Sequence, residues 1–378
     1  MSTEKAEKKR RILPRWFMLC PARHILLLAS SAVILAYFLL RKHSRLMTTV
    51  CEFFTRPWHR FYGKLCSFCP VSVAALLIAA TVIAVIVYIL ATLISALHRR
   101  GLAVGLYRIF ITLAAVVVTV YALFCVLWGT YYYTSDFEAN SGIYARPVSV
   151  EELQCVTEYF ARMANEYSSR VERGEDGLFS EDLDSIFACS PQLYDKVQEH
   201  FPCLEGPALE AKPFLFSKAM SYINFTGFFF PFTGEANINV DAPACLIPST
   251  IAHEIAHQRG VAAEDEANFV AVLSSLESGN DVYTYSAALL AYIHLSNALY
   301  SADLDAWRQV SALIGDAVRA DLDCNNKYWE KYETPISDVS DTVYTGFLQS
   351  YGQTLGLKSY GACVDLLTVY YLDIAKEG

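Results

Sequence analysis

The stretch STIAHEIAHQRGVAAEDEANF, residues 249–269, decides how the rest of this chain is interpreted. It contains the pattern HExxH, in which His253 and His257 stand four residues apart. Residues four apart share one face of a helix, so both imidazoles can point at one metal ion. Glu254 lies beside that face, where a carboxylate can take a proton from water and pass it to a leaving amine. The stretch predicts a zinc site; the alternative is an amphipathic helix end with a charged tail.

The residues around the pattern are those of a helix followed by a tight turn. Pro248, with a serine and a threonine after it, is a plausible helix start. Gly260 can turn the chain directly after His257. A second helix is then expected to open at about Ala262, and its first turns carry three acids that could return to the metal.

Catalytic zinc takes three protein ligands and keeps one open position. The run Glu264-Asp265-Glu266-Ala267-Asn268 resembles the E-x-x-A-[D/N] pattern that carries the third ligand in glutamate-type zincins. That resemblance makes Glu264 the expected ligand, with Glu266 as the runner-up. It also places Asn268 one turn later, where its side chain can hydrogen-bond a ligating histidine. The alternative is that these acids only interact favourably with the helix dipole.

An extended segment precedes the motif and is a candidate for binding substrate. In zincin folds an edge strand near the active helix binds peptide substrate by adding it to the sheet. The alternatives are a plain structural hairpin and, for Glu235, a polar group of the cleft. The segment alternates as a half-buried strand does, and it comprises Gly234, Glu235, Ala236, Asn237, Ile238 and Asn239.

Three apolar runs in the first third of the chain predict transmembrane helices. Residues 71–97 and 109–133 contain 27 and 25 uncharged residues, more than the roughly 20 that cross a bilayer. Residues 25–40 contain only 16, and a signal peptide is the rival interpretation, although no small-x-small cleavage site precedes Arg41. Trp128 and the tyrosines at 131–133 are typical of an interfacial aromatic belt.

Charge divides the chain in the same place. Residues 1–133 contain 16 Lys and Arg and three acids, whereas residues 134–378 contain 14 Lys and Arg and 36 acids. This division predicts a membrane anchor at 1–133, a polar linker at 134–150 and a soluble domain at 151–378, with the lipid bilayer as a partner. The acidic remainder argues against binding to nucleic acid. Helical periodicity dominates the soluble part, so the expected fold is mainly α with a small β element.

The basic residues near the spans predict the orientation. Ten Lys and Arg flank the spans on the side of the N-terminus, and six lie in the first loop on the other side. The N-terminus is therefore expected inside the cell and the soluble domain outside the cytoplasm. If residues 25–40 do not span, the soluble domain faces the cytoplasm instead. The six cysteines of the soluble part leave disulfides and buried thiols equally open.

The motifs together resemble the bacterial membrane family catalogued as domain of unknown function 3810. The resemblance covers most of the chain and implies a three-span anchor and a zincin-like α+β domain, without a substrate. It is carried by PFTGEANIN at 231–239, HEIAHQRGVAAEDEANF at 253–269, FLQSYGQTLGLKSY at 347–360 and LWGTYYY at 127–133.

These observations predict a multi-pass membrane protein with a zinc-dependent peptidase domain. His253, His257 and Glu264 are expected to bind Zn²⁺, Glu254 to act as general base, and a peptide or protein to be the substrate. A tyrosine can stabilise the oxyanion, and the spacing does not choose among those at 344, 351 and 360; His294 is expected in the core. The alternatives are a non-catalytic protein with a structural or sensory metal site, and a membrane protein without a metal.

Overall fold

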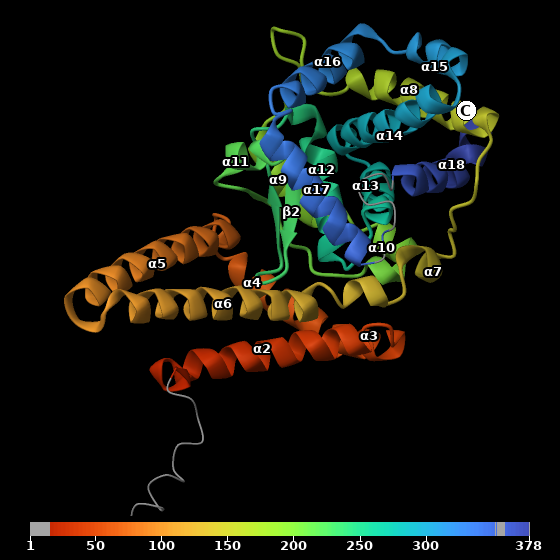
Figure 1. The fold of residues 1–378 in the computed structure, drawn as a ribbon. Coiled ribbons are helices and arrows are strands. Elements are labelled where there is room, and N and C mark those ends of the chain that lie inside the picture. The colour runs from red at the N-terminus through yellow and green to blue at the C-terminus, as the bar shows by residue number, and fades with distance from the viewer. Residues whose placement is uncertain (1–15, 352, 354–359, 378) are drawn as a thin grey trace, which may run out of the picture.

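The structure, a computed structural model, describes residues 16–351, 353 and 360–377. These residues form many helices and one small sheet, and the apolar N-terminal helices project from the helical remainder (Figure 1). The expectation of a mainly helical chain with a small β element is confirmed.

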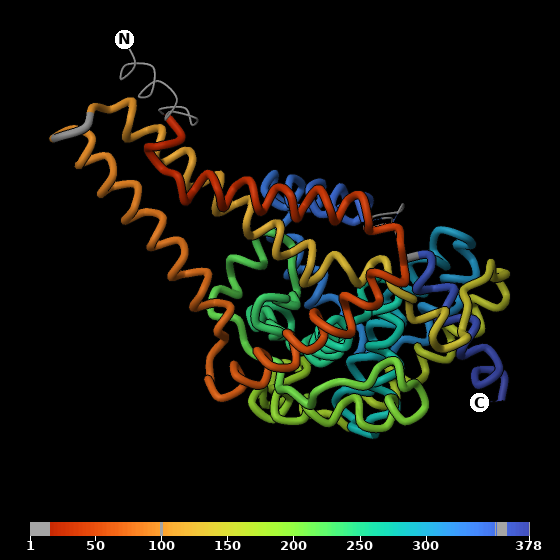
Figure 2. Tube along the Cα trace, turned by 90° about the horizontal axis from the view of Figure 1, so that it is seen from below, coloured from red at the N-terminus to blue at the C-terminus, as the bar shows by residue number. Residues whose placement is uncertain are grey.

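Within the described part of the chain, three helices are long and apolar enough to cross a membrane: Pro21–Leu40, Val73–His98 and Leu102–Leu127. They comprise α2 (Pro21–Leu40), α5 (Val73–Ser95) with the π-helical turn η4 (Ala96–Arg100), and α6 (Leu102–Leu127). The third lies several residues earlier than the expected 109–133. The helix continues through Arg108, which an uncharged run cannot include, and the aromatic residues after Leu127 form the separate turn η5 (Tyr131–Tyr133). Figure 2 shows these helices extending away from the rest of the molecule.

The segment between the first two of these helices is helical, where the sequence predicted only a loop. It consists of α3 (Ser44–Val50), the π-helical turn η3 (Cys51–Thr55) and α4 (Arg56–Cys66). The indole nitrogen of Trp58 donates to the carbonyl of Phe232 at 3.1 Å, and Thr55 Oγ1 donates to the carbonyl of Val126 at 2.9 Å. This segment therefore joins the end of α6 to the soluble part.

The soluble part is built mainly of helices around one apolar core. The long central helix α14 packs against α8, α12, α13 and α18, and the core includes the fully buried Phe160, Phe269 and Tyr285. Burying such side chains contributes about 1.5–3 kcal/mol each relative to exposure. The helices are α7 (Phe137–Ser141), α8 (Val150–Ser168), α9 (Leu183–Cys189), α10 (Val197–His200), α11 (Ser217–Tyr222), α12 (Ile247–Gln258), α13 (Glu264–Ser278), α14 (Asp281–Ala302), α15 (Leu304–Ser311), α16 (Asp316–Glu330), α17 (Pro335–Ser350) and α18 (Tyr360–Glu377), with short 3-10 turns η6 (Ser190–Gln192), η7 (Pro202–Leu204) and η8 (Ala244–Leu246). A further 3-10 turn, η2 (Phe17–Leu19), precedes α2.

The sheet has the strand order β1 (Lys212–Pro213), β3 (Glu235–Ile238), β2 (Gly227–Phe230). Strand β3 pairs in parallel with β1 and antiparallel with β2. The expectation that residues 234–239 form the substrate-binding edge strand is therefore wrong, because hydrogen bonds occupy both sides of β3. Among the described residues the two outer strands are β1 and β2, and β2 is the longer of them.

Glu235 connects the sheet to the second apolar helix rather than lining a cleft. Its buried carboxylate lies 2.8 Å from Lys212 Nζ and accepts hydrogen bonds from the backbone nitrogens of Val73 and Ala74 at 3.0 and 2.9 Å. An anion at a helix N-terminus interacts favourably with the helix dipole. On the same strand, Asn237 Oδ1 accepts a hydrogen bond from Ser72 at 2.6 Å. This strand thus attaches the soluble domain to the start of α5.

Candidate metal centre

Helix α12 ends where a turn can bring the next helix back beside it. Pro248 lies in its first turn, and the chain leaves it through Gly260, whose φ of +96° favours glycine. The backbone nitrogen of Val261 donates to the carbonyl of Ala256 at 3.0 Å and closes the turn. Helix α13 then begins at Glu264, so its first side chain lies against the histidines of α12.

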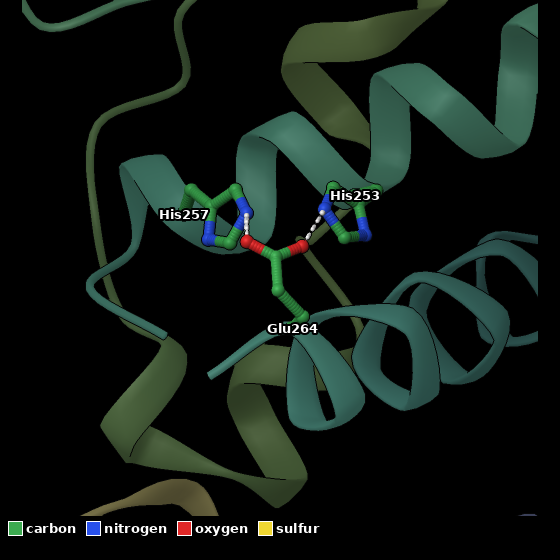
Figure 3. Close-up of side chains that lie close together, drawn as sticks. All are labelled: His253, His257 and Glu264. Carbon is green, nitrogen blue, oxygen red and sulfur yellow. Dashed lines mark ion pairs between the residues drawn. The ribbon is translucent and has the colours of Figure 1, made fainter. Parts of the chain in front are cut away.

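Glu264 lies between the two histidines (Figure 3). Its Oε2 is 3.2 Å from His253 Nε2, and its Oε1 is 3.5 Å from His257 Nε2. One potential ligand atom from each of the three residues lies within 4.8 Å of the other two. The three side chains come from two helices and converge on one point, which suits a small cation.

The other ring nitrogen of each histidine already has a partner. Nδ1 of His253 lies 2.9 Å from Oδ1 of Asn268, and Nδ1 of His257 lies 2.7 Å from the carbonyl oxygen of Val261. An oxygen acceptor at Nδ1 holds the proton on that nitrogen and leaves the Nε2 lone pair for a metal. Both imidazoles are therefore oriented as ligands with their Nε2 atoms facing Glu264.

The three groups shift one another's pKa values. Burial alone lowers the pKa of His257, but the carboxylate of Glu264 outweighs it and raises that pKa to about 9. Burial alone raises the pKa of Glu264, but the two histidines outweigh this effect and hold that pKa well below its usual value. Attraction between buried opposite charges explains both shifts. A carboxylate flanked by two imidazoles is a donor set of the type that binds zinc.

Glu254 lies next to the cluster and against strand β2. Burial raises the pKa of its carboxyl group, and the charges of His253 and His257 only partly offset this. Its Oε2 is buried and has no hydrogen-bond partner in the described part of the chain. A Cβ added to Gly227 would lie only 2.7 Å from Glu254 Oε1. The backbone of β2 therefore passes so close to this carboxyl group that no side chain fits between them.

A cleft with a volume of about 660 Å³ opens over these residues. One wall is strand β2 and the turn before it, and another is helix α17. Tyr344 of α17 donates its hydroxyl hydrogen to Oε1 of Glu264 at 2.6 Å, and burial raises its pKa well above the usual value. The end of α6 contributes Trp128, whose ring meets His257 edge-on at 5.5 Å between centroids.

The remaining acids of the motif lie elsewhere. Glu266 is buried, and its Oε1 accepts a hydrogen bond from the backbone nitrogen of Glu138 at 3.0 Å. Burial raises the pKa of Glu266 to about 7. The carboxylate of Asp265 accepts from the backbone nitrogen of Glu266 at 3.0 Å. Neither residue joins the cluster of possible metal ligands in the described residues.

Several cleft residues were not expected from the sequence. His294 was expected in the core but lines the cleft, where burial and then His253 lower its pKa to about 4. Trp128 and Tyr132 were interpreted only as an interfacial belt. Of the three candidate tyrosines, Tyr344 lies at the cluster, Tyr351 stacks on Tyr132 with centroids 4.9 Å apart, and the one at 360 begins α18. A stretch of sequence carries no signal for such contacts, because the partners are far apart along the chain.

The cysteines do not form disulfides. All eleven are free thiols in the structure, and most are buried. Of the six in the soluble domain, Cys245 and Cys363 are buried, as the alternative of small buried side chains requires; three are partly buried, and Cys189 is exposed.

Comparison with known proteins identifies the family and nothing beyond it. Residues 51–368 match the family described as "Protein of unknown function (DUF3810)". No curated protein and no solved structure matches the chain. The matched region includes the last two apolar helices, the sheet, and the whole His253–Glu264 cluster. Because the match extends over most of its length, the chain belongs to the DUF3810 family.

Proposed function

We propose that this protein is a membrane-anchored zinc-dependent metallopeptidase with a zincin-like soluble domain. The observation that carries the proposal is the convergence of His253, His257 and Glu264 beside the buried carboxyl group of Glu254. Two imidazoles and a carboxylate are the ligands of a catalytic zinc site, which leaves one position for water or substrate.

The donor set fits zinc better than the harder cations. Imidazole nitrogens suit zinc and other transition metals, whereas magnesium and calcium prefer oxygen ligands. His253, His257 and Glu264 would hold the ion, and Asn268 and the carbonyl of Val261 would keep the imidazoles in place. Zinc, when bound, supplies Lewis acidity, which lowers the pKa of water and polarises a carbonyl oxygen.

Glu254 moves the proton. Because burial raises its pKa, the carboxylate is a stronger base than one in water. It accepts a proton from the attacking water and delivers it to the leaving amine. Tyr344 keeps its hydroxyl proton at all ordinary pH values, so it can donate a hydrogen bond to the oxygen that becomes negative. In the structure this hydroxyl donates to Glu264.

Strand β2 is the surface for the substrate backbone. Its free edge lines the cleft, and Gly227 brings the strand next to Glu254. A peptide added to this edge would place its amide groups beside the general base, with main-chain hydrogen bonds providing affinity for many sequences. The glycine is required there because a side chain would occupy the space of the carboxyl group.

Metal content and hydrolysis of the purified full-length protein test this proposal. We expect close to one zinc per chain in the wild type and in the control His200→Ala, whose side chain is exposed and pairs with Glu277. His253→Ala should lose the zinc, because two remaining ligands bind it weakly. Glu254→Gln should keep zinc and lose the ability to generate new amino-termini in a peptide library, because an amide cannot accept the proton.

Two results would overturn the proposal. Equal zinc in His253→Ala and in the wild type would remove the site. Zinc binding without any difference in new amino-termini between wild type and Glu254→Gln would leave a structural or sensory metal site in place of an enzyme.

A further inference from the structure

Exposed apolar side chains of the soluble domain gather on two neighbouring segments. One is the turn and helix that precede β2, and the other is helix α17, on which Val339 and Val343 are 63 and 67% exposed. Contiguous apolar surface is uncommon on a soluble protein and marks a contact site. The set that we call the apolar face consists of Leu215, Phe216, Tyr222, Ile223, Ile336, Val339 and Val343.

The two segments are joined directly. Ser340 Oγ donates to the carbonyl oxygen of Ile223 at 2.8 Å, and the amide of Asn224 lies 3.3 Å from the carboxylate of Asp341. The rings of Tyr222 and Tyr332 meet edge-on, with centroids 5.1 Å apart. The exposed apolar side chains therefore lie on two segments that are held side by side.

This surface is attached to all three apolar helices where they meet the soluble domain. Beside the first segment, Phe214 packs against Ala75 in the first turn of α5. At the end of α17, Phe347 packs against Phe124 of α6, and the carbonyl of Ser350 accepts a hydrogen bond from Arg41, next to the end of α2. In Figure 1, α17 runs down toward the C-terminal end of α6, and α11 lies above the start of α5.

Helix α17 has three different faces. Tyr344 and the buried Leu348 lie against the rest of the domain, and Asp338 and Thr342 are exposed polar residues. Ile336 and Val343 form a third side, which is exposed and apolar. A helix that must meet only water carries polar residues on all its exposed sides, whereas one at a membrane surface turns an apolar side to the lipid.

We propose that the apolar face lies in the surface of the lipid bilayer. The bilayer is the partner of this face because the segments that carry it adjoin three helices that are themselves apolar enough to cross a bilayer. Immersion removes these exposed side chains from water, which is favourable in proportion to the apolar area that is buried. The aromatic residues Phe216 and Tyr222 are also of the type that favours the lipid–water interface.

The position of α17 ties this contact to the cleft. The helix that carries the apolar face also carries Tyr344, and the cleft is bounded on another side by the end of α6. The mouth of the cleft therefore lies at the bilayer surface. As an extension that rests on the proposed function, the substrate is a polypeptide anchored in the same bilayer, cut in a segment close to its membrane span.

Lipid crosslinking tests the face without reference to metal or activity. The full-length protein is reconstituted in phosphatidylethanolamine–phosphatidylglycerol nanodiscs with benzoylphenylalanine at Val339 or Val343. We expect lipid adducts at both, as at the exposed Phe110 of α6, and few at Leu304 or Ile374, which are exposed on α15 and α18. Adduct yields at 339 and 343 no higher than at 304 and 374 would overturn the proposal.

Mapping of cleavage tests the substrate class separately. Bacterial inner-membrane vesicles and soluble bacterial proteins are mixed and incubated with wild type or Glu254→Gln. New amino-termini that depend on Glu254 should lie in membrane proteins near their spans; an even spread over soluble proteins would refute the substrate class. If adducts form at 339 and 343 and no new termini appear, the contact with the bilayer stands and the proposed function fails.

Discussion

The amide oxygen of Asn268 lies 2.9 Å from Nδ1 of His253, one helical turn beyond the carboxylate that faces the same imidazole. Glu264 and Asn268 stand four residues apart on α13. One helix therefore supplies the carboxylate that faces Nε2 of His253 and the amide oxygen that faces its Nδ1. The orientation of His253 therefore depends on how α13 is placed against α12.

Removing this hydrogen bond should weaken metal binding without removing a ligand. Asn268→Ala is expected to lower zinc affinity by about 10- to 100-fold, because such partners orient the imidazole and raise its basicity. Asn268→Asp, which keeps an acceptor oxygen, should bind zinc far better than the alanine variant. Competition with a chelator measures both, and Asn297→Ala on the exposed side of α14 is the control. Wild-type affinity in Asn268→Ala would show that the contact is incidental.

Substitutions of Glu264 and Glu266 should have different effects on zinc binding. Glu264→Ala should release zinc from the purified protein, since its carboxylate is the group that faces both histidines. Glu266→Ala should keep zinc, because its carboxylate is directed to the backbone of Glu138. Elemental analysis of the two variants decides between them. Loss of zinc from the Glu266 variant alone would mean that the assignment of the third ligand is wrong.

Gly227 should be intolerant of even one methyl group. A Cβ there would lie 2.7 Å from Oε1 and 2.8 Å from Cγ of Glu254, so either the strand or the carboxyl group must move. Displacement of a catalytic group by about 1 Å can reduce the rate by about 10²-fold. We expect Gly227→Ala to keep zinc and to lose hydrolysis by about that factor.

A second glycine, on the helix that forms another wall of the cleft but outside its lining, provides the matched control. A Cβ on Gly346 of α17 meets nothing within 4 Å among the described residues, so Gly346→Ala should keep both zinc and activity. Both rates are measured with the same peptide library. Full activity in Gly227→Ala would show that the strand is not held against Glu254 in solution.

The soluble domain is expected outside the cytoplasm. The prediction rests on the ten against six basic residues around the spans and on α2 crossing the membrane. Alkaline phosphatase, which is active only outside the cytoplasm, should be active when fused after the last residue, and green fluorescent protein in the same place should be dark after export. Inactive alkaline phosphatase together with fluorescent green fluorescent protein would place His253, His257 and Glu264 in the cytoplasm. It would also show that Pro21–Leu40 does not cross the membrane.

The sequence by itself determined the features that depend on neighbours along the chain. The period of the helix places His253 and His257 on one face of α12, and the same period places Glu264 and Asn268 on one face of α13. The turn at Gly260 follows from a backbone conformation that only a residue without a side chain adopts easily. The three apolar helices follow from the length of hydrocarbon that a helix must cross, which is also a local property.

The tertiary structure decided everything that depends on distant partners. It placed β3 between two strands, so that the free edge at the cleft belongs to β2, and it directed Glu235 to the start of α5 instead of to the cleft. It brought Tyr344 to Glu264 and Trp128 to His257, although each pair is far apart in the sequence. Such contacts arise only when the core and the apolar helices pack together, because no short stretch of residues specifies which distant side chain fills the space beside it.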